Sequence, residues 1–349
     1  MRPVLAGLGA AFPPSLAQSQ LWQGFFAEHY RGVRTAARIF QHAGVEYRHA
    51  AVNPLAENIS GVGTGGRMDR YVTEALPLGR AAVDAAMADA GLAPDDVGLL
   101  AVVSCTGYAT PGIDILLARD LGLPAGVQRL LIGHMGCYGA LPGLAAVSDF
   151  VVARQRPAVL LCVEVTSLHM QPATRDVSQV VAHALFSDAA AALVLRPDAG
   201  TGAGVALEVV DLAAATDTST ADQMTWEVTD HGFRMGLSPR VPDSLAAQLP
   251  AMVTDLLGRY DLTPTDVAGW AVHPGGPRIL DVVQKELGLP PEALTPSRET
   301  LRRHGNCSSA TVLVVLRDLL AGGVRPGGHV VALAFGPGLT LYGVLLRAV

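Results

Sequence analysis

Apolar residues along the first half of the chain alternate between a helical repeat and short continuous runs. A repeat of about 3.6 residues predicts amphipathic helices, whereas unbroken apolar runs predict strands that are buried on both faces. The expected helices cover 78–90, 112–121 and a long segment after Gly136, and the expected strands cover 97–105, 128–132, 158–165 and 189–195. Strands that alternate with helices predict an α/β protein with a mixed or parallel sheet covered on both faces.

The same pattern partly returns in the second half of the chain, with helices expected over 244–260 and 277–287 and a strand over 267–272. The turn Gly91-Leu-Ala-Pro-Asp-Asp-Val has a counterpart in Asp261-Leu-Thr-Pro-Thr-Asp-Val, and each follows a helix and precedes a strand. This match indicates a duplicated architecture. The glycine-rich stretch 196–204 is the candidate join, so we predict two halves, 1–200 and 201–349.

Composition and charge narrow the possible functions. The net charge is −6 and aromatic residues make up 5% of the chain, which disfavours nucleic acid as a partner because such binding needs clustered cations and stacking rings. Lys285 is the only lysine and lies on the polar face of an expected helix. Schiff-base and P-loop chemistry both need a lysine in the site, so the sequence argues against them.

The cysteines form no CxxC pair, so the sequence predicts neither a zinc site nor any other metal centre. A chain of this size needs no disulfides, and a reduced, cytoplasmic setting is the expectation. The N-terminal apolar stretch is broken by glycines and stopped by prolines, which favours a buried strand over a signal peptide. We expect no membrane span, because no apolar run reaches the roughly 18 residues that a span requires.

Three residues far apart in the chain each lie at a glycine turn beside a buried element: Cys137, His273 and Asn306. Taken singly, each also fits a structural role, as a small core residue, a hydrogen-bonded histidine and a helix N-cap. Together they form a nucleophilic set, because a helix N-terminus favours thiolate and histidine can accept the thiol proton. The imidazole and amide N–H groups can then donate to an oxyanion or enolate. Such a set suits acyl transfer through a thioester.

The motifs around these residues resemble those of type III polyketide synthases, the chalcone synthase-like branch of the thiolase superfamily. The resemblance covers nearly the whole chain, and its Gly-Pro-Gly loop is a feature that ketoacyl synthases lack. The matching segments are Gly136-Cys137, Trp270-Ala-Val-His273-Pro-Gly-Gly-Pro, Gly305-Asn-Cys-Ser-Ser-Ala, Leu185-Phe186-Ser-Asp188-Ala-Ala-Ala-Ala and Phe335-Gly-Pro-Gly-Leu-Thr340. The resemblance implies a duplicated αβαβα thiolase-like fold of five layers, and a homodimer.

By the same resemblance, Cys137 would hold the starter acyl group and the growing chain, and His273 and Asn306 would direct decarboxylation of malonyl-CoA. Acyl-CoA and malonyl-CoA would be the substrates, with no cofactor. Repeated Claisen condensation and cyclisation would give a pyrone or resorcinol-type product. The segments typical of bacterial members favour an aliphatic acyl starter, while malonyl-CoA as its own starter stays open.

Other residues match substrate-binding positions of the family. Phe186 matches the gatekeeping phenylalanine, although core packing is its alternative role, and Met235 stands where plant members have a second phenylalanine. Thr110 matches the position that reaches the partner subunit's site. The remaining candidates for the cavity lining are Cys105, Thr106, His169 and Ser308, and those for binding the CoA phosphates are Arg31, Arg34, Arg38 and Arg48.

Three alternative functions share part of this pattern. A ketoacyl synthase of fatty-acid type has the same triad but stops after one condensation on an acyl carrier protein. A papain-like protease also orders Cys, His and Asn along the chain, yet the tryptophan-flanked cysteine, signal peptide and disulfides of that family are missing here. A non-catalytic thiolase-fold binding protein would not need an intact triad.

Overall fold

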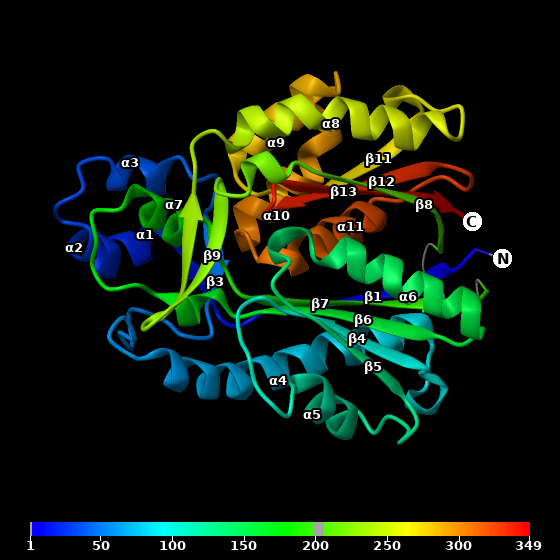
Figure 1. Cartoon of the computed structure of the whole chain (residues 1–349), viewed down its shortest axis with the longest axis horizontal. Helices are drawn as coiled ribbons and strands as arrows, with labels where there is room; N and C mark the ends of the chain where they lie inside the picture. Colours follow the sequence, from blue (N-terminus) through cyan, green and yellow to red (C-terminus); the bar gives the residue numbers. More distant parts are fainter. Residues whose placement is uncertain (1, 199–205) are drawn as a thin grey trace.

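The computed structural model describes residues 2–198 and 206–349, so the predicted boundary at residue 200 and most of the candidate join lie outside the described residues. The described strands include a nine-stranded sheet that runs through the whole molecule (Figure 1). Its strands, in spatial order, are β11 (Val267–Val272), β12 (His329–Gly336), β13 (Thr340–Ala348), β8 (Leu207–Thr216), β1 (Val4–Ala11), β7 (Ala189–Arg196), β6 (Ala158–Glu164), β4 (Leu99–Val103) and β5 (Gln128–Ile132).

The sheet consists of two halves with the same pairing pattern. β1 and β8 join the halves, and within the described residues they pair Val4 with Glu208 and Leu5 with Leu207. Outward from this junction, the order β1-β7-β6-β4 matches β8-β13-β12-β11, and both series pair antiparallel, antiparallel and then parallel. β5 extends the first half by one further strand. The duplication expected from the sequence is therefore confirmed.

The two similar turns occupy corresponding places in the halves. α4 (Thr64–Ala90) leads through the turn Pro94–Asp96 to β4, and α8 (Val241–Gly258) leads through the turn Pro264–Asp266 to β11. Gly91 and Asp261, which begin the two motifs, both have left-handed backbones, with φ of 60° and 55°. α4 begins well before the predicted residue 78, and its earlier turns, despite their weak helix formers, bury the side chains of Arg67, Tyr71 and Ala75.

Helices cover both outer faces of the halves and fill the space between them, which gives the five predicted layers (Figure 1). α6 (Ala140–Arg154) and α11 (Thr311–Ala321) form the central layer and pack in one apolar cluster with strands of both halves. α4 and α5 (Ile113–Asp120) cover the outer face of the first half. α8 and α9 (Pro277–Glu286) cover the outer face of the second half.

A cap of smaller elements lies beside the layers and closes over one end of the sheet (Figure 1). It contains two small antiparallel sheets and several short helices, and α10 joins it to the second half. These elements are β2 (Ser15–Ala17), α1 (Gln18–Leu21), a π-helical turn (Trp22–Phe26), α2 (Ala27–His29), α3 (Ala36–Gln41), β3 (Tyr47–His49), α7 (Val177–Leu185), β9 (Met224–Thr229), β10 (Gly232–Leu237) and α10 (Thr295–His304).

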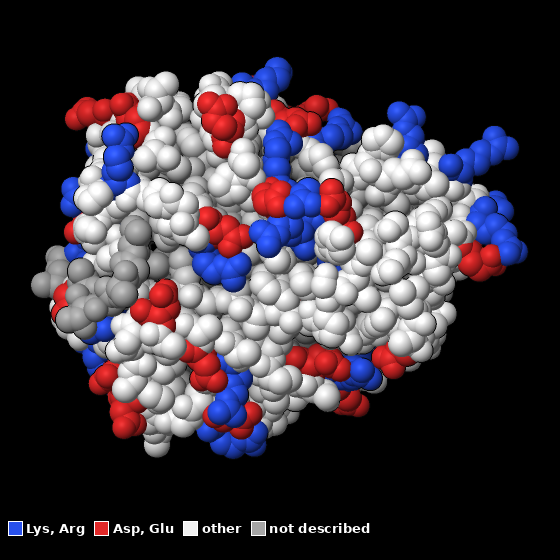
Figure 2. All heavy atoms as spheres, turned by 180° about the vertical axis from the view of Figure 1, so that it is seen from behind, with Lys and Arg blue, Asp and Glu red and all other residues white. Residues whose placement is uncertain are grey.

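One described segment, Gly136–Arg154, is long and apolar enough to cross a membrane by length and composition. It contains α6, which packs between the two halves, and half of its most apolar window is buried. This packing is typical of a core helix. Figure 2 shows basic and acidic side chains intermixed on the rear face of the molecule.

Candidate active site

Cys137 lies where the central layer begins. After β5, the turn Gly136–Tyr138 leads directly into α6, so the thiol is near the N-terminus of a buried helix. Gly136 has φ +72°, and a Cβ there would lie 3.0 Å from Pro337 Cδ, so a larger residue would strain the backbone and crowd the Gly-Pro-Gly loop. The turn that carries Cys137 is therefore packed closely against the Gly-Pro-Gly loop.

His273 directly follows β11, at the carboxyl end of a strand that pairs in parallel with β12. Its backbone N–H donates to the Leu333 carbonyl at 2.8 Å, which fixes the main chain beside the sheet. The side chain is 1% exposed, and neither ring nitrogen has a hydrogen-bond partner among the described residues. Buried polar atoms are normally paired, so an unpaired imidazole that faces a cavity is poised to bind a ligand.

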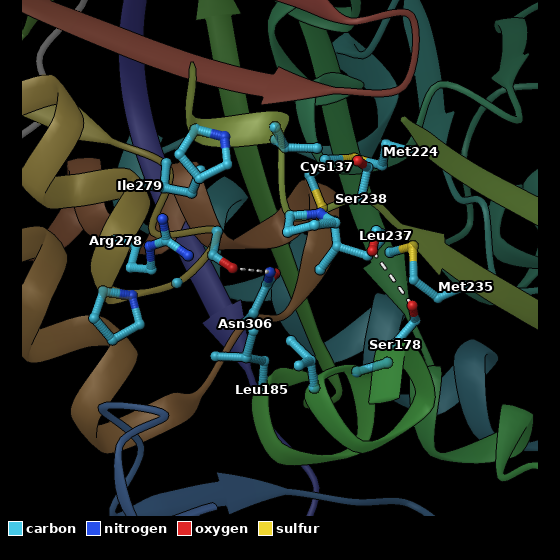
Figure 3. A pocket seen from close by; sticks show the side chains of 18 of the residues that line it. Cys137, Ser178, Leu185, Met224, Met235, Leu237, Ser238, Arg278, Ile279 and Asn306 are labelled. Atoms are coloured by element: carbon cyan, nitrogen blue, oxygen red, sulfur yellow. Dashed lines mark hydrogen bonds between the residues drawn. The ribbon is translucent and has the colours of Figure 1, made fainter. Parts of the chain in front are cut away.

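Asn306 is held by the segment that carries Phe186. The Asn306 N–H donates to the Leu185 carbonyl at 2.8 Å, and the Ser187 N–H donates to the Asn306 carbonyl at 2.9 Å. The side-chain Oδ1 accepts from the Ser308 N–H at 2.9 Å, which fixes the amide orientation. Its Nδ2 donates to the Gly275 carbonyl over a long 3.5 Å (Figure 3), so the amide presents N–H groups rather than an acceptor to the cavity.

The three side chains line one cavity of about 570 Å³. Figure 3 shows Cys137 and Asn306 in its wall. Around them the wall is mostly apolar, with contributions from α3, α7, α8, α9 and the β9–β10 hairpin. Prominent apolar members of the lining are Ile39, Val181, Leu185, Met224, Leu237, Val241, Leu245, Ile279, Phe335 and Leu339. Such walls suit an acyl chain and exclude water from the thioester.

Burial has the largest effect on the pKa values of Cys137 and His273. It raises the pKa of the Cys137 thiol to about 12, against smaller lowering effects of hydrogen bonds from Ser308 and Asn306. Burial also lowers the pKa of His273 to about 3. A lone thiolate and a lone imidazolium are thus both disfavoured. A thiolate–imidazolium pair would compensate the two opposite charges.

Two of the predicted substrate-binding residues line this cavity: Phe186 and Met235. Cys105, Thr106 and Ser308 do not line it, contrary to the prediction, although they lie close behind Cys137. Cys105 Sγ is 3.5 Å from Ser308 Oγ, and Thr106 Oγ1 donates to Glu164 at 2.8 Å. These side chains belong to a buried polar cluster that includes Glu164.

His169 was expected in the cavity wall and is instead buried, at 4% exposure, behind the hairpin. Its Nε2 hydrogen-bonds the Thr106 carbonyl at 2.7 Å, and its Nδ1 accepts from the Phe233 N–H at 2.9 Å. Burial lowers its pKa to about 4. Thr110 lies at the surface, where its hydroxyl donates to Tyr108 at 3.1 Å, outside this protomer's cavity.

The four predicted CoA-binding arginines do not form one cluster. Arg48 is buried and donates to the carbonyls of His183 and Phe186, so it is not available to phosphates, and that prediction is wrong. Arg31 pairs with Glu28. Arg34 and Arg38 are exposed, and α3, which carries Arg38, contributes Ile39 to the cavity wall.

Sequence reasoning missed one residue of the cavity wall, Arg278, and two residues that contact Cys105, Glu164 and Trp226. Arg278 is the second residue of α9 and lines the cavity (Figure 3). Its signal in the sequence is a cation that directly follows the Pro-Gly-Gly-Pro turn after His273. Glu164 is the last residue of the buried strand β6. A carboxylate at the carboxyl end of a core strand also indicates a functional site in the sequence. Trp226 comes from a hairpin that the apolar pattern did not predict.

Comparison with known proteins agrees with this geometry. The family described as "Chalcone and stilbene synthases, N-terminal domain" matches residues 51–199, and the corresponding C-terminal domain matches 212–349. A 1,3,6,8-tetrahydroxynaphthalene synthase of Streptomyces peucetius subsp. caesius is 38% identical over 318 residues, which cover 89% of this chain and 82% of that protein. A 3,5-dihydroxyphenylacetyl-CoA synthase of Streptomyces toyocaensis is 30% identical over 357 residues, covering 99% and 90%.

A solved structure gives the same result. The 1,3,6,8-tetrahydroxynaphthalene synthase from Streptomyces coelicolor A3(2), a bacterial type III polyketide synthase, aligns with a TM-score of 0.92 and 28% identity, and the match covers 99% of both chains. The chain belongs to the chalcone and stilbene synthase family, with its thiolase-like fold. Its activity is that of a type III polyketide synthase, a decarboxylating condensing acyltransferase. A single-condensation ketoacyl synthase is not favoured.

Proposed function

We propose that Cys137 receives a starter acyl group from acyl-CoA and that His273 and Asn306 direct its extension by malonyl-CoA. The observation that carries this proposal is the single apolar cavity lined by the thiol, the unpaired imidazole and the oriented amide. A cavity of about 570 Å³ has room for a pantetheine-linked malonyl group beside an acyl thioester.

The chemistry of each extension proceeds in two steps, decarboxylation and condensation. The carboxyl-bearing C–C bond of malonyl-CoA breaks, CO2 leaves, and the electron pair becomes an enolate whose oxygen accepts hydrogen bonds from His273 and Asn306. The enolate carbon then attacks the thioester carbonyl on Cys137, a C–C bond forms, and the thiolate departs. The extended chain is now a thioester of CoA. The Cys137 thiolate attacks that thioester, CoA leaves as its thiol, and the chain is again on Cys137 for the next round. Because loss of CO2 supplies the carbanion, no resident metal or cofactor takes part.

Phe186 and Met235 control passage through the cavity. Phe186 lines both this cavity and a small neighbouring pocket of about 50 Å³, so its ring forms part of the partition between them. Met235 carries a flexible thioether, which can yield to a bulky chain more easily than a phenyl ring.

The phosphates of CoA bind at the cavity mouth, where Arg38 and Arg278 are both exposed. Arg278 lines the cavity, and Arg38 precedes the lining residue Ile39 on α3. Guanidinium groups match phosphate oxygens in geometry and charge. Replacing Arg278 with alanine is therefore expected to raise KM for malonyl-CoA more than it lowers kcat.

The enzyme works as a homodimer in the cytoplasm, where thiols stay reduced. β5 is an edge strand of the sheet, and four of its five residues are exposed, including Leu130 and Leu131. Exposed apolar edge strands are normally covered, and the exposed Tyr108 and Thr110 supply a loop that a second copy could receive. Sedimentation analysis of a Leu131→Lys variant against the parent protein tests this arrangement.

The product is a pyrone or resorcinol-type ring. One relative is named for a 3,5-dihydroxyphenyl product, which is a resorcinol ring, and another for a tetrahydroxynaphthalene. The test is incubation with malonyl-CoA alone and with a panel of aliphatic acyl-CoA starters, followed by mass spectrometry. Cyclised products with several malonyl-derived units support the proposal, whereas a single β-ketoacyl product would contradict it.

A further inference from the structure

Arg48 is a buried cation on the short cap strand β3. Its side chain is 6% exposed, and burial lowers the pKa of the guanidinium to about 10, so the group is still charged at neutral pH. Its Nη1 atom donates to the carbonyls of His183 and Phe186, the latter at 3.1 Å. A buried charge is costly unless it is hydrogen-bonded, so these two contacts are what holds the guanidinium in the cap.

Both carbonyls belong to the C-terminal end of α7. The last carbonyls of a helix have no partner inside it, and they form the negative end of the helix dipole. A guanidinium at this end satisfies the carbonyls and compensates the dipole, so Arg48 caps α7. The capped helix supplies one wall of the reaction cavity, with the lining residues Val177, Ser178, Val181, Ala182 and Leu185.

The capped end of α7 runs directly into the segment that holds Asn306. Phe186 and Asn306 form a parallel β-bridge. In this bridge the Asn306 N–H donates to the Leu185 carbonyl at 2.8 Å, and the Ser187 N–H donates to the Asn306 carbonyl at 2.9 Å. The guanidinium therefore holds a bridge that carries the cavity-lining Phe186 on one side and the predicted enolate donor on the other.

The other two residues of the triad are positioned by different elements. Cys137 lies in the turn between β5 and α6, and His273 follows β11, where its N–H donates to the Leu333 carbonyl. The hydrogen bonds of Arg48 go to neither of these elements. Loss of the guanidinium should therefore displace the Asn306 amide while the thiol and the imidazole stay in place.

We infer that Arg48 is a positioning residue, which aims the Asn306 amide at the enolate oxygen by clamping the end of α7. This inference rests on the proposed function, because the enolate arises by decarboxylation of malonyl-CoA. Arg48 does not touch the substrate and acts through the bridge. Decarboxylation is the step most sensitive to its loss, since a donor stabilises the developing oxyanion only at hydrogen-bond distance.

Arg48→Met tests this role, because it keeps most of the side-chain volume and removes both hydrogen bonds. For CO2 release from malonyl-CoA, kcat should fall at least tenfold, while KM should change less than threefold because the cavity mouth is untouched. Labelling of Cys137 by iodoacetamide should stay within twofold of the parent rate. Unchanged CO2 release overturns the inference, and so does a loss of labelling as large as the loss of CO2 release.

Arg48→Lys shows whether the hydrogen bonds themselves matter, because one ammonium group can donate to both carbonyls. It should restore CO2 release to within threefold of the parent, and equal rates in the lysine and methionine variants overturn the inference. If Arg48→Met does not fold, Arg48→Gln takes its place in the same comparison, since its shorter amide keeps the site polar but does not reach both carbonyls.

Arg234→Met is the matched control. Arg234 pairs at 2.8 Å with Asp176, which is the N-cap of α7 at the opposite end of the helix, and both side chains are partly exposed. Such a pair contributes little to stability, so this variant should match the parent. An equal loss of CO2 release in Arg234→Met would assign the effect to α7 as a whole and overturns the inference.

Hydrogen exchange tests the positioning without any substrate. In Arg48→Met, the Ser187 and Asn306 amides that close the bridge should exchange at least tenfold faster than in the parent, while the amides of β11 stay equally protected. Unchanged exchange at the bridge overturns the inference. If the parent releases no CO2 from malonyl-CoA, the proposed function fails, and the exchange rates still decide whether Arg48 holds the bridge.

Discussion

Replacing His273 with alanine should make the reactivity of Cys137 strongly dependent on pH. In the buried site a thiolate is stable only beside a positive charge. Two histidines line the cavity with Cys137, and of these His273 is the buried one that can accept the thiol proton, whereas His42 is exposed. Without His273, burial alone sets the ionisation of the thiol.

The magnitude follows from the pKa of the isolated thiol. Burial raises the pKa of Cys137 from 9.0 to about 12, so without an ion pair its thiolate fraction at pH 7 is lower than that of an ordinary cysteine by roughly a thousandfold. Alkylation of Cys137 in His273→Ala should therefore be slow at pH 7 and rise about tenfold per pH unit up to pH 10. The parent enzyme should reach a plateau at a much lower pH.

The assay follows iodoacetamide labelling of the Cys137 peptide by mass spectrometry between pH 5 and pH 10. His329→Ala is the matched control, since this histidine is at the opposite end of β12 from the site and should leave the profile unchanged. If the parent and His273→Ala give the same pH profile, His273 is not the proton acceptor and the reasoning about the pair is refuted.

Four further predictions address the site and the fold. Cys137→Ala should make no polyketide yet still release CO2 from malonyl-CoA, whereas Asn306→Ala should lose most CO2 release because the enolate oxygen loses a donor; normal CO2 release by the asparagine variant would contradict that role. Met235→Phe should reduce turnover of long acyl starters more than of short ones, and equal effects on both would argue against gating. Burial lowers the pKa of His169 from 6.5 to about 4, so the unfolded state binds more protons in that range and the free energy of unfolding falls as the pH drops from 6.5 to 4, by at most about 3 kcal/mol. His169→Gln does not titrate, so its unfolding free energy should depend less on pH over this interval, and an unchanged dependence would show that His169 is not the source. Activity should survive dialysis against a chelator, and a loss restored by divalent metal would contradict the cofactor-free scheme.

Much of the fold could be predicted from the sequence, because the patterns that indicate helices, strands and turns involve residues close together in the chain. The strand at Gln128–Ile132 matches the expected bounds, and the paired Pro-containing turns mark equivalent places in the two halves. Cys137, His273 and Asn306 could be found for the same reason, since each follows a glycine turn or a core strand whose direction the pattern fixes. Elements of this kind depend on residues close in sequence.

The extent of the cavity could not be predicted, because it depends on contacts between distant segments. The Cys105 carbonyl accepts a hydrogen bond from the indole N–H of Trp226, in a hairpin that comes much later in the chain. Arg48 appeared to belong to a cationic patch, but the fold buries it against carbonyls of the segment that ends α7. Arg278 joins the cavity mouth because α9 begins there. Local patterns carry no information on such tertiary neighbours.

The most direct test of the account is to trap the acyl-enzyme. The intact protein is mixed with an acyl-CoA starter, quenched in acid, digested and mapped by mass spectrometry, before and after addition of isotopically labelled malonyl-CoA. We expect the starter on Cys137 alone, followed by adducts on the same residue that grow by labelled two-carbon units. An acyl group on Cys105, or no covalent adduct in an enzyme that is making product, would contradict the central claim.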